Sequence, residues 1–258
     1  MSDIISIITV VYNSEKTIEY TLKSIISQSY KDKEIIVIDG NSSDSTMTIV
    51  NKYKDSIETI ISEPDKGIYD AMNKGVKFAK GNWVCFMNSG DSFYNEHVLE
   101  DVSHLLLDEY GIIYGDTDSI TRYGHVLDKA RPTTYIRENM PCCHQSCFAK
   151  RSLLQEYPFD LSYKIVSDYN FVFQAYMNGV AIKKIDVIVA TYNAADGFSA
   201  NNKYVLFKEI LRIHNYSRLS PITVKLYLSY GKYFALEYLN QYFPFVVKAI
   251  RSIKHKFL

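Results

Sequence analysis

The sequence predicts an α/β fold, with a mixed, mostly parallel central sheet flanked by helices and a helical C-terminal tail. Two observations predict this class. Along residues 1–91, short continuously apolar segments alternate with segments whose apolar residues recur at helical spacing. The connections between them are short, and such a succession requires parallel strands joined by right-handed crossovers. From about residue 201 onward the pattern is helical, interrupted at Pro221 and Pro244.

Four strands are predicted in the first half, and the first, second and fourth are apolar runs typical of buried strands. They cover Ile4–Tyr12, Glu34–Asp39, Glu58–Ser62 and Trp83–Met87. Three helices connect them. The first is predicted to be capped by Asn13-Ser14 and the second by Asp44 or Ser45, because short polar side chains satisfy the N–H groups at a helix start. The third follows a break at residues 63–67 and is predicted to stop at Gly81.

After residue 91 the order of elements changes. The predicted elements are a helix over Val98–Leu106, a strand over Gly111–Gly115, a hairpin of Ser119–Arg122 with Val126–Lys129, a strand over Gln145–Lys150, a helix from Ser167 to Gly179 and a last strand over Val187–Tyr192. No internal repeat or low-complexity linker separates them. The sequence therefore predicts one α/β domain over residues 1–198 and a helical extension over residues 199–258.

The composition is that of an ordinary globular protein. The 258 residues are 47% hydrophobic and the formal net charge is zero, so no overall charge indicates a nucleic-acid partner. No apolar run reaches the length of a membrane-spanning helix, and the first residues resemble a strand instead of a signal peptide. A cytoplasmic protein is expected. The 22 tyrosines can line sugar-binding grooves, but half-buried packing is the favoured interpretation.

Four cysteines occur, at positions 85, 142, 143 and 147. Cys85 lies in a predicted buried strand, where a thiol is a small core side chain. Cys142, Cys143, His144 and Cys147 lie close together in the sequence, but their spacing fits no zinc pattern well. Structural zinc is therefore not favoured, and a reducing cytosol disfavours disulfides.

Polar residues follow the predicted strands of the first half at their carboxyl ends. These ends carry residues 9–13, Asp39, residues 63–67 and residues 88–91. Parallel strands bring them to one rim of the sheet, where ligands of open α/β sheets bind. Asp39 is expected to accept a hydrogen bond from a nucleoside, and Asp91 to hold a divalent cation on a diphosphate. Helix capping is the better interpretation of Asp44, and a solvated turn is an open alternative for residues 88–91 taken alone.

Several segments, in this order along the chain, resemble family 2 glycosyltransferases of the GT-A fold, a Rossmann-like α/β fold. Within residues 6–91 they are SIITVVYN, EIIVIDGNSSDST, SEPDKGIYDAMNKGVKFAKGNW and VCFMNSGD. Met140-Pro-Cys-Cys-His-Gln-Ser and Ser167-Asp-Tyr-Asn-Phe resemble the acceptor half in weaker form. The family uses a nucleotide-diphosphate sugar and usually inverts the anomeric centre. The resemblance implies a nucleotide-sugar-binding half over residues 1–91 and an acceptor half over residues 92–198.

The resemblance implies roles for particular positions. Asp39 would bind the base. The nucleoside pocket would be edged by Thr9, Val11, Tyr12 and Asn13, and the rest of the nucleotide would lie beside Lys66, Gly67, Asp70, Asn73, Asn88 and Ser89. His144 and Gln145 would orient the acceptor or touch the diphosphate, although a structural role is equally open for the histidine.

One departure from the family pattern concerns the metal. Asp91 occupies the position of the last metal-binding carboxylate, but the family typically has Asp-x-Asp or Asp-Asp before the turn, whereas this chain has Asn88-Ser89-Gly90-Asp91. Asp91, the Asn88 carbonyl, waters and the diphosphate can still complete the shell of Mn²⁺ or Mg²⁺. A metal-dependent enzyme is therefore expected.

Asp168 resembles the catalytic base of the family. An acceptor hydroxyl must lose its proton while it attacks the anomeric carbon from the face opposite the departing diphosphate, and a carboxylate can accept that proton. A carboxylate in the first turn of a helix is kept ionised by the helix dipole. Without the resemblance, Asp168 would be interpreted as an ordinary first-turn acid.

The resemblance implies an inverting, metal-dependent glycosyltransferase that moves a hexose or N-acetylhexosamine, with UDP as the expected nucleotide. It also implies a saccharide or lipid-linked saccharide acceptor in bacterial surface-polysaccharide or O-antigen-type synthesis. Two other classes stay open: another nucleotide-using α/β transferase, and a non-catalytic nucleotide-sugar or glycan-binding module. The first strand is followed by no G-x-G-x-x-G and no Walker lysine loop, which counts against dinucleotide and P-loop enzymes.

The C-terminal end has the pattern of a basic amphipathic helix. Its apolar residues at helical spacing are Val246, Val247, Ile250, Ile253 and Phe257, and its basic residues are Lys248, Arg251, Lys254, His255 and Lys256. Such a helix can lie in an anionic membrane surface, or it can pack on the domain with a solvated outer face. With a lipid-linked acceptor, the first alternative predicts peripheral contact with the inner face of the cytoplasmic membrane.

Overall fold

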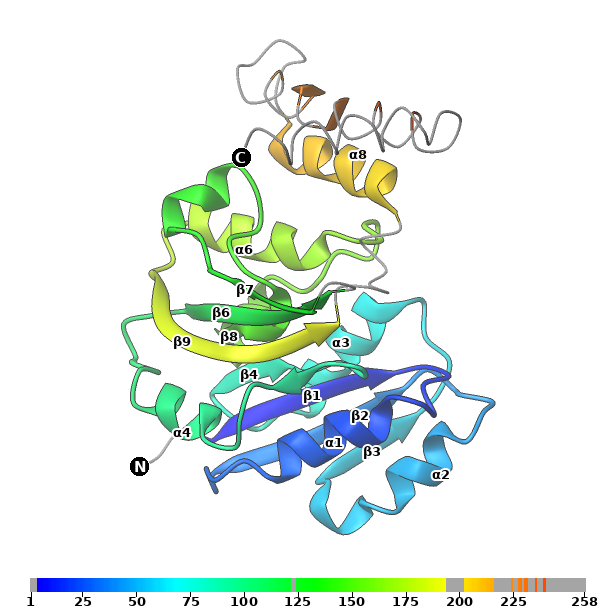
Figure 1. The fold of residues 1–258 in the computed structure, drawn as a ribbon. Coiled ribbons are helices and arrows are strands. Elements are labelled where there is room, and N and C mark those ends of the chain that lie inside the picture. The colour runs from blue at the N-terminus through cyan, green and yellow to red at the C-terminus, as the bar shows by residue number, and fades with distance from the viewer. Residues whose placement is uncertain are drawn as a thin grey trace. The chain divides into compact units, whose positions relative to one another are not determined.

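The computed structural model describes residues 4–121, 124–193 and 202–215, together with positions 224, 227, 228, 230, 231, 235 and 239. These residues contain a nine-stranded mixed sheet with helices on both faces (Figure 1). The chain divides into two compact units between Val205 and Leu206. The domain boundary after residue 198 stays a prediction.

The N-terminal half has the strand–helix alternation that the sequence predicts. The strands are β1 (Ile5–Val11), β2 (Lys33–Asp39), β3 (Thr59–Ser62) and β4 (Trp83–Phe86). They pair in parallel in the order β3-β2-β1-β4. Their connections contain α1 (Ile18–Ile26), α2 (Thr46–Asn51), the 3-10 helix η1 (Lys54–Ser56) and α3 (Ile68–Phe78). The carboxyl ends of β1, β2 and β4 therefore share one rim of the sheet.

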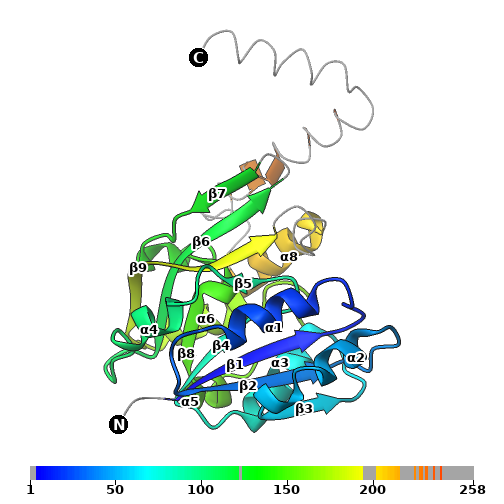
Figure 2. The same cartoon turned by 60° about the horizontal axis from the view of Figure 1, so that its bottom comes forward.

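The second half extends the sheet beyond β4 in the order β8, β6, β9 and β5, and β7 pairs with β6. Its elements are β5 (Ser92–Phe93), α4 (Val98–Ser103), β6 (Ile112–Thr121), β7 (Gly124–Asp128), the 3-10 helices η2 (Thr133–Arg137) and η3 (His144–Ser146), β8 (Cys147–Lys150), α5 (Arg151–Glu156), α6 (Ser167–Met177) and β9 (Ile182–Asn193). Helix α8 (Lys203–His214) follows. β8 is antiparallel to β4 and β6, whereas β6 and β9 are parallel. In Figure 2, β6 and β7 lie side by side at a distance from β1–β3.

Both faces of β1, β2 and β4 are covered, which explains their largely apolar sequences, whereas β3 at the edge of the sheet is only partly buried. On one face, Ile5 and Ile7 of β1 belong to the same buried cluster as Leu22 and Ile25 of α1. On the other face lies α3, in which a Cβ at Gly75 would come within 2.5 Å of the Ile8 side chain. Complete burial of each such aliphatic side chain contributes about 1.5–3 kcal/mol.

The start of α1 differs from the prediction. The helix begins at Ile18 with Thr17 at its N-cap, so the prediction that Asn13-Ser14 cap it is wrong. Asn13 has φ +46° and joins two loops instead. Its Oδ1 accepts the Ser43 N–H at 2.9 Å, and its own N–H donates to Ser42 Oγ at 2.8 Å. The loops that follow β1 and β2 are thereby held together at the rim.

The next two helices also show what their polar and glycine residues do. Ser45 is the N-cap of α2 by position, without a capping bond from its side chain, and the Asp44 carboxylate accepts the Thr46 N–H at 2.9 Å, so Asp44 supplies the hydrogen bond at this start. Helix α3 ends at Phe78, before Gly81. A Cβ at Gly81 would come within 2.4 Å of the Ile4 backbone oxygen, just before β1. This glycine is therefore required by a close backbone approach and does not cap the helix.

In the second half the sequence pattern conceals long strands. The predicted strand over residues 111–115 and the first arm of the predicted hairpin form one strand, β6, because Asp116, Thr117 and Asp118 interrupt its apolar pattern without ending it. β9 begins five residues before the predicted start. Lys183 and Lys184 interrupt the apolar pattern over its first residues, which nevertheless pair with β6. β5 and α5 were not predicted.

In the described part of the chain, no helix has both the length and the apolar character needed to cross a membrane. The basic amphipathic helix predicted at residues 246–257 lies outside the described residues.

Candidate active site

The turn that follows β4 is held in place by α1. The fully buried Thr21 hydroxyl accepts the Gly90 N–H at 2.9 Å and donates to the Asp91 carbonyl at 2.7 Å. The Asp91 N–H closes the turn on the Asn88 carbonyl at 3.0 Å. Gly90 has φ +102°, a conformation that favours glycine. A core helix therefore fixes where the Asn88 and Asp91 side chains lie.

Replacing Thr21 with Val is expected to destabilise the protein by roughly 1–3 kcal/mol, because it leaves a buried N–H and a buried carbonyl without their partner. Chemical denaturation measures this change. The matched control is Thr17→Val, since the Thr17 hydroxyl is exposed and bonds only to Ser14 O at 3.4 Å and to Ser89 Oγ at 3.0 Å. Its change should stay within about 0.5 kcal/mol. Equal losses in the two variants would contradict the role given to Thr21.

Asp91 is a buried carboxyl group in this turn, with a relative exposure of 7%. Burial raises its pKa to about 7. The Gln145 side chain approaches the carboxyl group and partly offsets this rise in pKa. Gln145 Nε2 itself has no hydrogen-bond partner among the described residues. Among the described residues no Lys or Arg forms an ion pair with Asp91. A cation would therefore find an uncompensated ligand here.

Asn88 lies beside Asp91 and is also buried. Its Nδ2 lies 3.0 Å from His144 Nε2, and its Oδ1 is a buried acceptor that has no partner among the described residues. Burying such a group unpaired costs about 1–3 kcal/mol, so an unpaired oxygen in the same turn as a buried carboxyl group makes this turn a candidate ligand site. Amide and carboxylate oxygens suit Mg²⁺ and Mn²⁺.

Asp168 is in the first turn of α6, as predicted, and its two oxygens have different surroundings. Oδ1 accepts the Tyr169 N–H at 2.8 Å and lies 3.0 Å from the Tyr69 hydroxyl. Oδ2 lies 3.9 Å from His144 Nδ1. Burial, and next the charge of Asp168, raise the pKa of Tyr69, so the phenol stays protonated and its single proton is shared between two acceptors, the carboxylate and a backbone carbonyl. The hydroxyl lies 2.5 Å from this carbonyl, which is that of Ile165.

These residues form one cluster, although they come from the end of β4, from η3 and from α6. Burial, opposed by the charge of Asp168, lowers the pKa of His144, so the imidazole between Asn88 and Asp168 is neutral at pH 7. Burial raises the pKa of the neighbouring Cys143 thiol to about 11, and the charges of Asp128, Asp91 and Asp168 add to this rise. The Cys143 thiol therefore lies close enough to both Asp91 and Asp168 for their charges to affect its pKa. No three His, Cys, Asp or Glu side chains in the described residues are arranged to hold a metal ion by themselves.

The predicted nucleoside residues lie on the same rim, at the ends of β1 and β2. Asp39 is fully buried and its carboxylate accepts hydrogen bonds from the Ser42 N–H and from the hydroxyls of Ser42 and Ser62. These bonds hold the loop after β2, and contact with a base stays a prediction. Thr9 and Val11 are buried, and the Thr9 Oγ1 has no partner among the described residues. Tyr12 and Asn13 are exposed at the rim.

The residues predicted near the ribose or diphosphate shape the start of α3. Lys66 and Gly67 are exposed, and the Asp70 carboxylate accepts the Lys66 N–H at 3.0 Å. Asn73 is engaged at both ends: its Nδ2 donates to the Phe159 carbonyl and its Oδ1 accepts the Phe159 N–H. Asn73 therefore holds the segment before α6, and a contact of Asn73 or Asp70 with a nucleotide stays a prediction.

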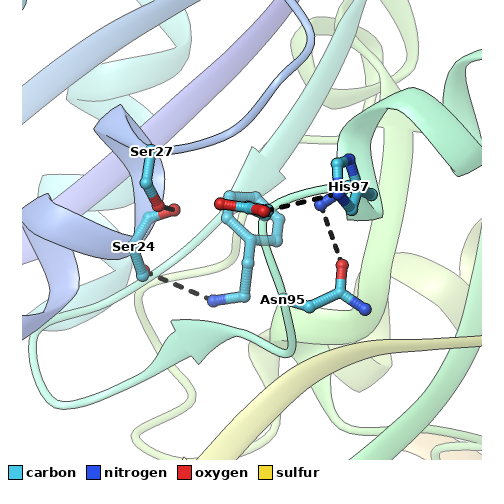
Figure 3. A pocket seen from close by; sticks show the side chains of 6 residues that line it. Ser24, Ser27, Asn95 and His97 are labelled. Atoms are coloured by element: carbon cyan, nitrogen blue, oxygen red, sulfur yellow. Dashed lines mark hydrogen bonds and ion pairs between the residues drawn. The ribbon is translucent and has the colours of Figure 1, made fainter.

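A separate open depression of about 460 Å³ lies between α1 and the segment before α4 (Figure 3). It is lined by Ser24, Ser27, Phe93, Asn95, Glu96 and His97. None of the predicted site residues lines it, and its side chains are largely exposed and engaged with one another, so we do not assign the site to it.

The chain resembles known proteins over most of its length. The family model described as "Glycosyl transferase family 2" matches residues 6–157. A PGL/p-HBAD biosynthesis glycosyltransferase of Mycobacterium bovis is 31% identical over 217 residues, covering 80% of this chain and 82% of the relative. The UDP-Glc:alpha-D-GlcNAc-diphosphoundecaprenol beta-1,3-glucosyltransferase WfgD of Escherichia coli is 28% identical over 216 residues, covering 81% and 83%. Among solved structures, S. aureus TarS in complex with UDP-GlcNAc superposes with a TM-score of 0.66 at 22% identity, covering 86% of this chain and 71% of that one.

Proposed function

The chain belongs to glycosyl transferase family 2, and on this premise we propose that it transfers a hexose or N-acetylhexosamine from a nucleotide-diphospho-sugar to a saccharide acceptor with inversion. The family and the GT-A fold predicted from the sequence are confirmed. The observation that supports the proposal most is the convergence of Asn88 and Asp91, at the end of β4, with Asp168 of α6 through the single side chain of His144.

In the proposed reaction Asp168 is the base. The acceptor oxygen forms a bond to the anomeric carbon while the bond from that carbon to the diphosphate oxygen breaks, and the electron pair leaves with the diphosphate. The hydroxyl proton passes to Asp168. Oδ2 suits this role better than Oδ1, because Oδ1 already accepts the Tyr169 N–H and faces the Tyr69 hydroxyl.

Asp91 and Asn88 Oδ1 would hold Mn²⁺ or Mg²⁺. The buried carboxyl group and the buried, unpaired amide oxygen fit an oxygen-liking cation, with water and the diphosphate completing the shell. When bound, the cation would supply electrostatic stabilisation of the leaving diphosphate. Because it would be held by only two side chains, we expect it to bind tightly only together with the nucleotide.

The donor and acceptor classes are taken from the relatives. The name of the E. coli relative specifies a UDP-glucose donor and a diphosphoundecaprenol-linked acceptor. We therefore propose a UDP-sugar donor and a lipid-linked saccharide acceptor for this chain, in the assembly of a surface glycan. The test is release of UDP from a panel of UDP-sugars with Mn²⁺, with and without acceptor. A non-catalytic binding module would bind a donor and release no UDP.

Replacing Tyr69 with Phe is expected to lower kcat roughly tenfold and to leave UDP affinity unchanged, because it removes a hydroxyl that lies 3.0 Å from Asp168 Oδ1 and also bonds to the Ile165 carbonyl at the start of α6. The control is Tyr114→Phe, which removes the hydrogen bond of another buried tyrosine to the Arg131 carbonyl at 2.8 Å. If both variants lose activity only in proportion to their lost stability, Tyr69 does not act on Asp168.

We also propose that residues beyond Gly231 attach the enzyme to the inner face of the cytoplasmic membrane. The support is the basic amphipathic pattern of residues 246–257 and a lipid-linked acceptor. In flotation with anionic liposomes, the full chain is expected to float and a chain ending near Gly231 to stay in the dense fraction. Equal recovery of both would rule the attachment out.

A further inference from the structure

The Asn88 side chain has two ends that are nearly equal in shape and opposite in chemistry: an acceptor, Oδ1, and a donor, Nδ2. Only the acceptor end can bind a cation. The backbone carbonyl of Asn88 already accepts the Asp91 N–H at 3.0 Å within the turn, so we take the side-chain oxygen as the ligand. The use of Asn88 as a ligand therefore depends on which way its amide is turned.

His144 is the side chain that can decide this orientation. Its Nε2 lies 3.0 Å from Asn88 Nδ2, and Nδ2 can only donate, so Nε2 must be the unprotonated nitrogen of the ring. The ring proton is then on Nδ1, which is the nitrogen that faces Asp168 Oδ2 at 3.9 Å. A negatively charged carboxylate on that side favours a proton on the nearer nitrogen. The position of Asp168 thus sets the histidine tautomer, and the tautomer sets the amide.

We propose that His144 is a positioning residue that turns the Asn88 amide so that Oδ1, and not Nδ2, faces the cation of the donor. The inference rests on the proposed metal site and adds to it a reason why Asn can serve at this position. A carboxylate has two equivalent oxygens and would need no such orientation. An asparagine needs a partner that accepts from Nδ2, and His144 is that partner.

With the opposite tautomer, Nε2–H would require an acceptor, and the amide would turn by 180° to offer Oδ1 to the ring. Two N–H donors would then point toward the cation, which they cannot bind. Asn88, His144 and Asp168 consequently act as one unit, in which a change at the base side alters the ligand at the donor side.

The first test reads the tautomer directly and needs neither activity nor metal. Long-range ¹H–¹⁵N correlation spectra of the full chain, labelled at histidine and recorded at neutral pH, distinguish the two neutral forms, and His144→Gln assigns the signal. We expect Nδ1–H for His144 in the unsubstituted chain. In Asn88→Ala, which leaves Asp168 in place, we expect Nδ1–H still, whereas in Asp168→Asn, which removes the charge that favours this form, we expect a mixture of both forms. A predominant Nε2–H signal in the unsubstituted chain would overturn the proposal.

The second test measures Mn²⁺ binding in the presence of UDP by electron paramagnetic resonance. His144→Phe removes no metal ligand, yet we expect it to weaken Mn²⁺ binding roughly 10- to 100-fold, as loss of a side chain that orients a ligand does. His144→Gln, whose amide oxygen can accept from Asn88 Nδ2, should recover most of the affinity. The control is His97→Phe, which alters an exposed histidine away from the site.

Equal Mn²⁺ affinity in His144→Phe and the unsubstituted chain would overturn the proposal, and so would absence of any Mn²⁺ binding. Either result is compatible with glycosyl transfer, which UDP release measures separately. Conversely, a chain that shows the expected tautomer and Mn²⁺ affinities but releases no UDP from any donor would contradict the proposed function and leave the role of His144 supported.

Discussion

Replacing Asp168 with Asn is expected to abolish sugar transfer while binding of the nucleotide without metal is retained. The substitution keeps the size and the hydrogen-bonding oxygen of the side chain but removes the carboxylate that would take the acceptor proton. Removal of a general base lowers kcat about 10²- to 10⁴-fold. UDP release in the presence of acceptor measures the loss, and calorimetric titration with UDP in the absence of metal measures the binding. With Mn²⁺ present the affinity should fall, because the carboxylate that favours the Nδ1–H form of His144 is gone.

The control for this substitution is Asp186→Asn, which neutralises an exposed carboxylate on β9 that contacts Lys184 at 3.4 Å. This variant should transfer sugar at the unsubstituted rate. We expect Asp168→Asn to change the free energy of unfolding little, because the Asn side-chain oxygen can still accept the Tyr169 N–H. If Asp168→Asn transfers sugar as fast as the control, Asp168 is not the base.

Replacing Asp91 with Asn is expected to remove Mn²⁺-dependent UDP binding and, without metal, to stabilise the protein at alkaline pH. The carboxyl pKa is raised from 3.8 to about 7 in the folded protein, whereas in the unfolded chain it is normal. The folded state therefore holds the proton more tightly. This contribution to stability is fully present below about pH 4 and is lost as the pH rises through about 7.

The size of the Asp91 effect follows from the same shift. From 3.8 to about 7 is about three pKa units, which corresponds to at most on the order of 4 kcal/mol. Thermal unfolding without metal, at pH 5 and pH 8, should show that Asp91→Asn raises the melting temperature more at pH 8. Mn²⁺ with UDP should raise it in the unsubstituted chain and not in the variant. Parallel pH profiles of the two proteins would show that Asp91 does not titrate as described.

The N-terminal half of the fold was predictable because β1, β2 and β4 are largely apolar on both faces and each helix has one apolar stripe. The second half was not, because its strands are mixed in character. β6 carries Asp116 and Asp118 inside a buried strand, where Asp116 accepts the Ala130 N–H at 2.8 Å. β5 is only two residues long and exists through its pairing with β9. Local patterns do not contain these tertiary contacts.

The polar residues that form the candidate site could be predicted from the sequence, whereas the residues that hold them in place could not. Asn88, Asp91, His144 and Asp168 stand out as polar residues at strand ends and a helix start, and the structure brings them together. Asn73 shows the limit of the resemblance, because both ends of its amide bind the Phe159 backbone.

Thr21 and Tyr69 were missed for the same physical reason. Each lies on the buried face of a helix, where Thr and Tyr are ordinary packing residues. Their function comes from partners 70 and 99 residues away, the Asp91 carbonyl and the Asp168 carboxylate. The available signal for Thr21 was a polar residue on the otherwise apolar stripe of α1.

The most direct test of the proposed site is a crystal structure of the chain with UDP and Mn²⁺. We expect the cation within about 2.0–2.4 Å of both Asp91 and Asn88 Oδ1, and the β-phosphate on the same side of the sheet rim as Asp168. A nucleotide bound in the depression beside Ser24 and His97, or a cation that contacts neither Asp91 nor Asn88, would contradict the account.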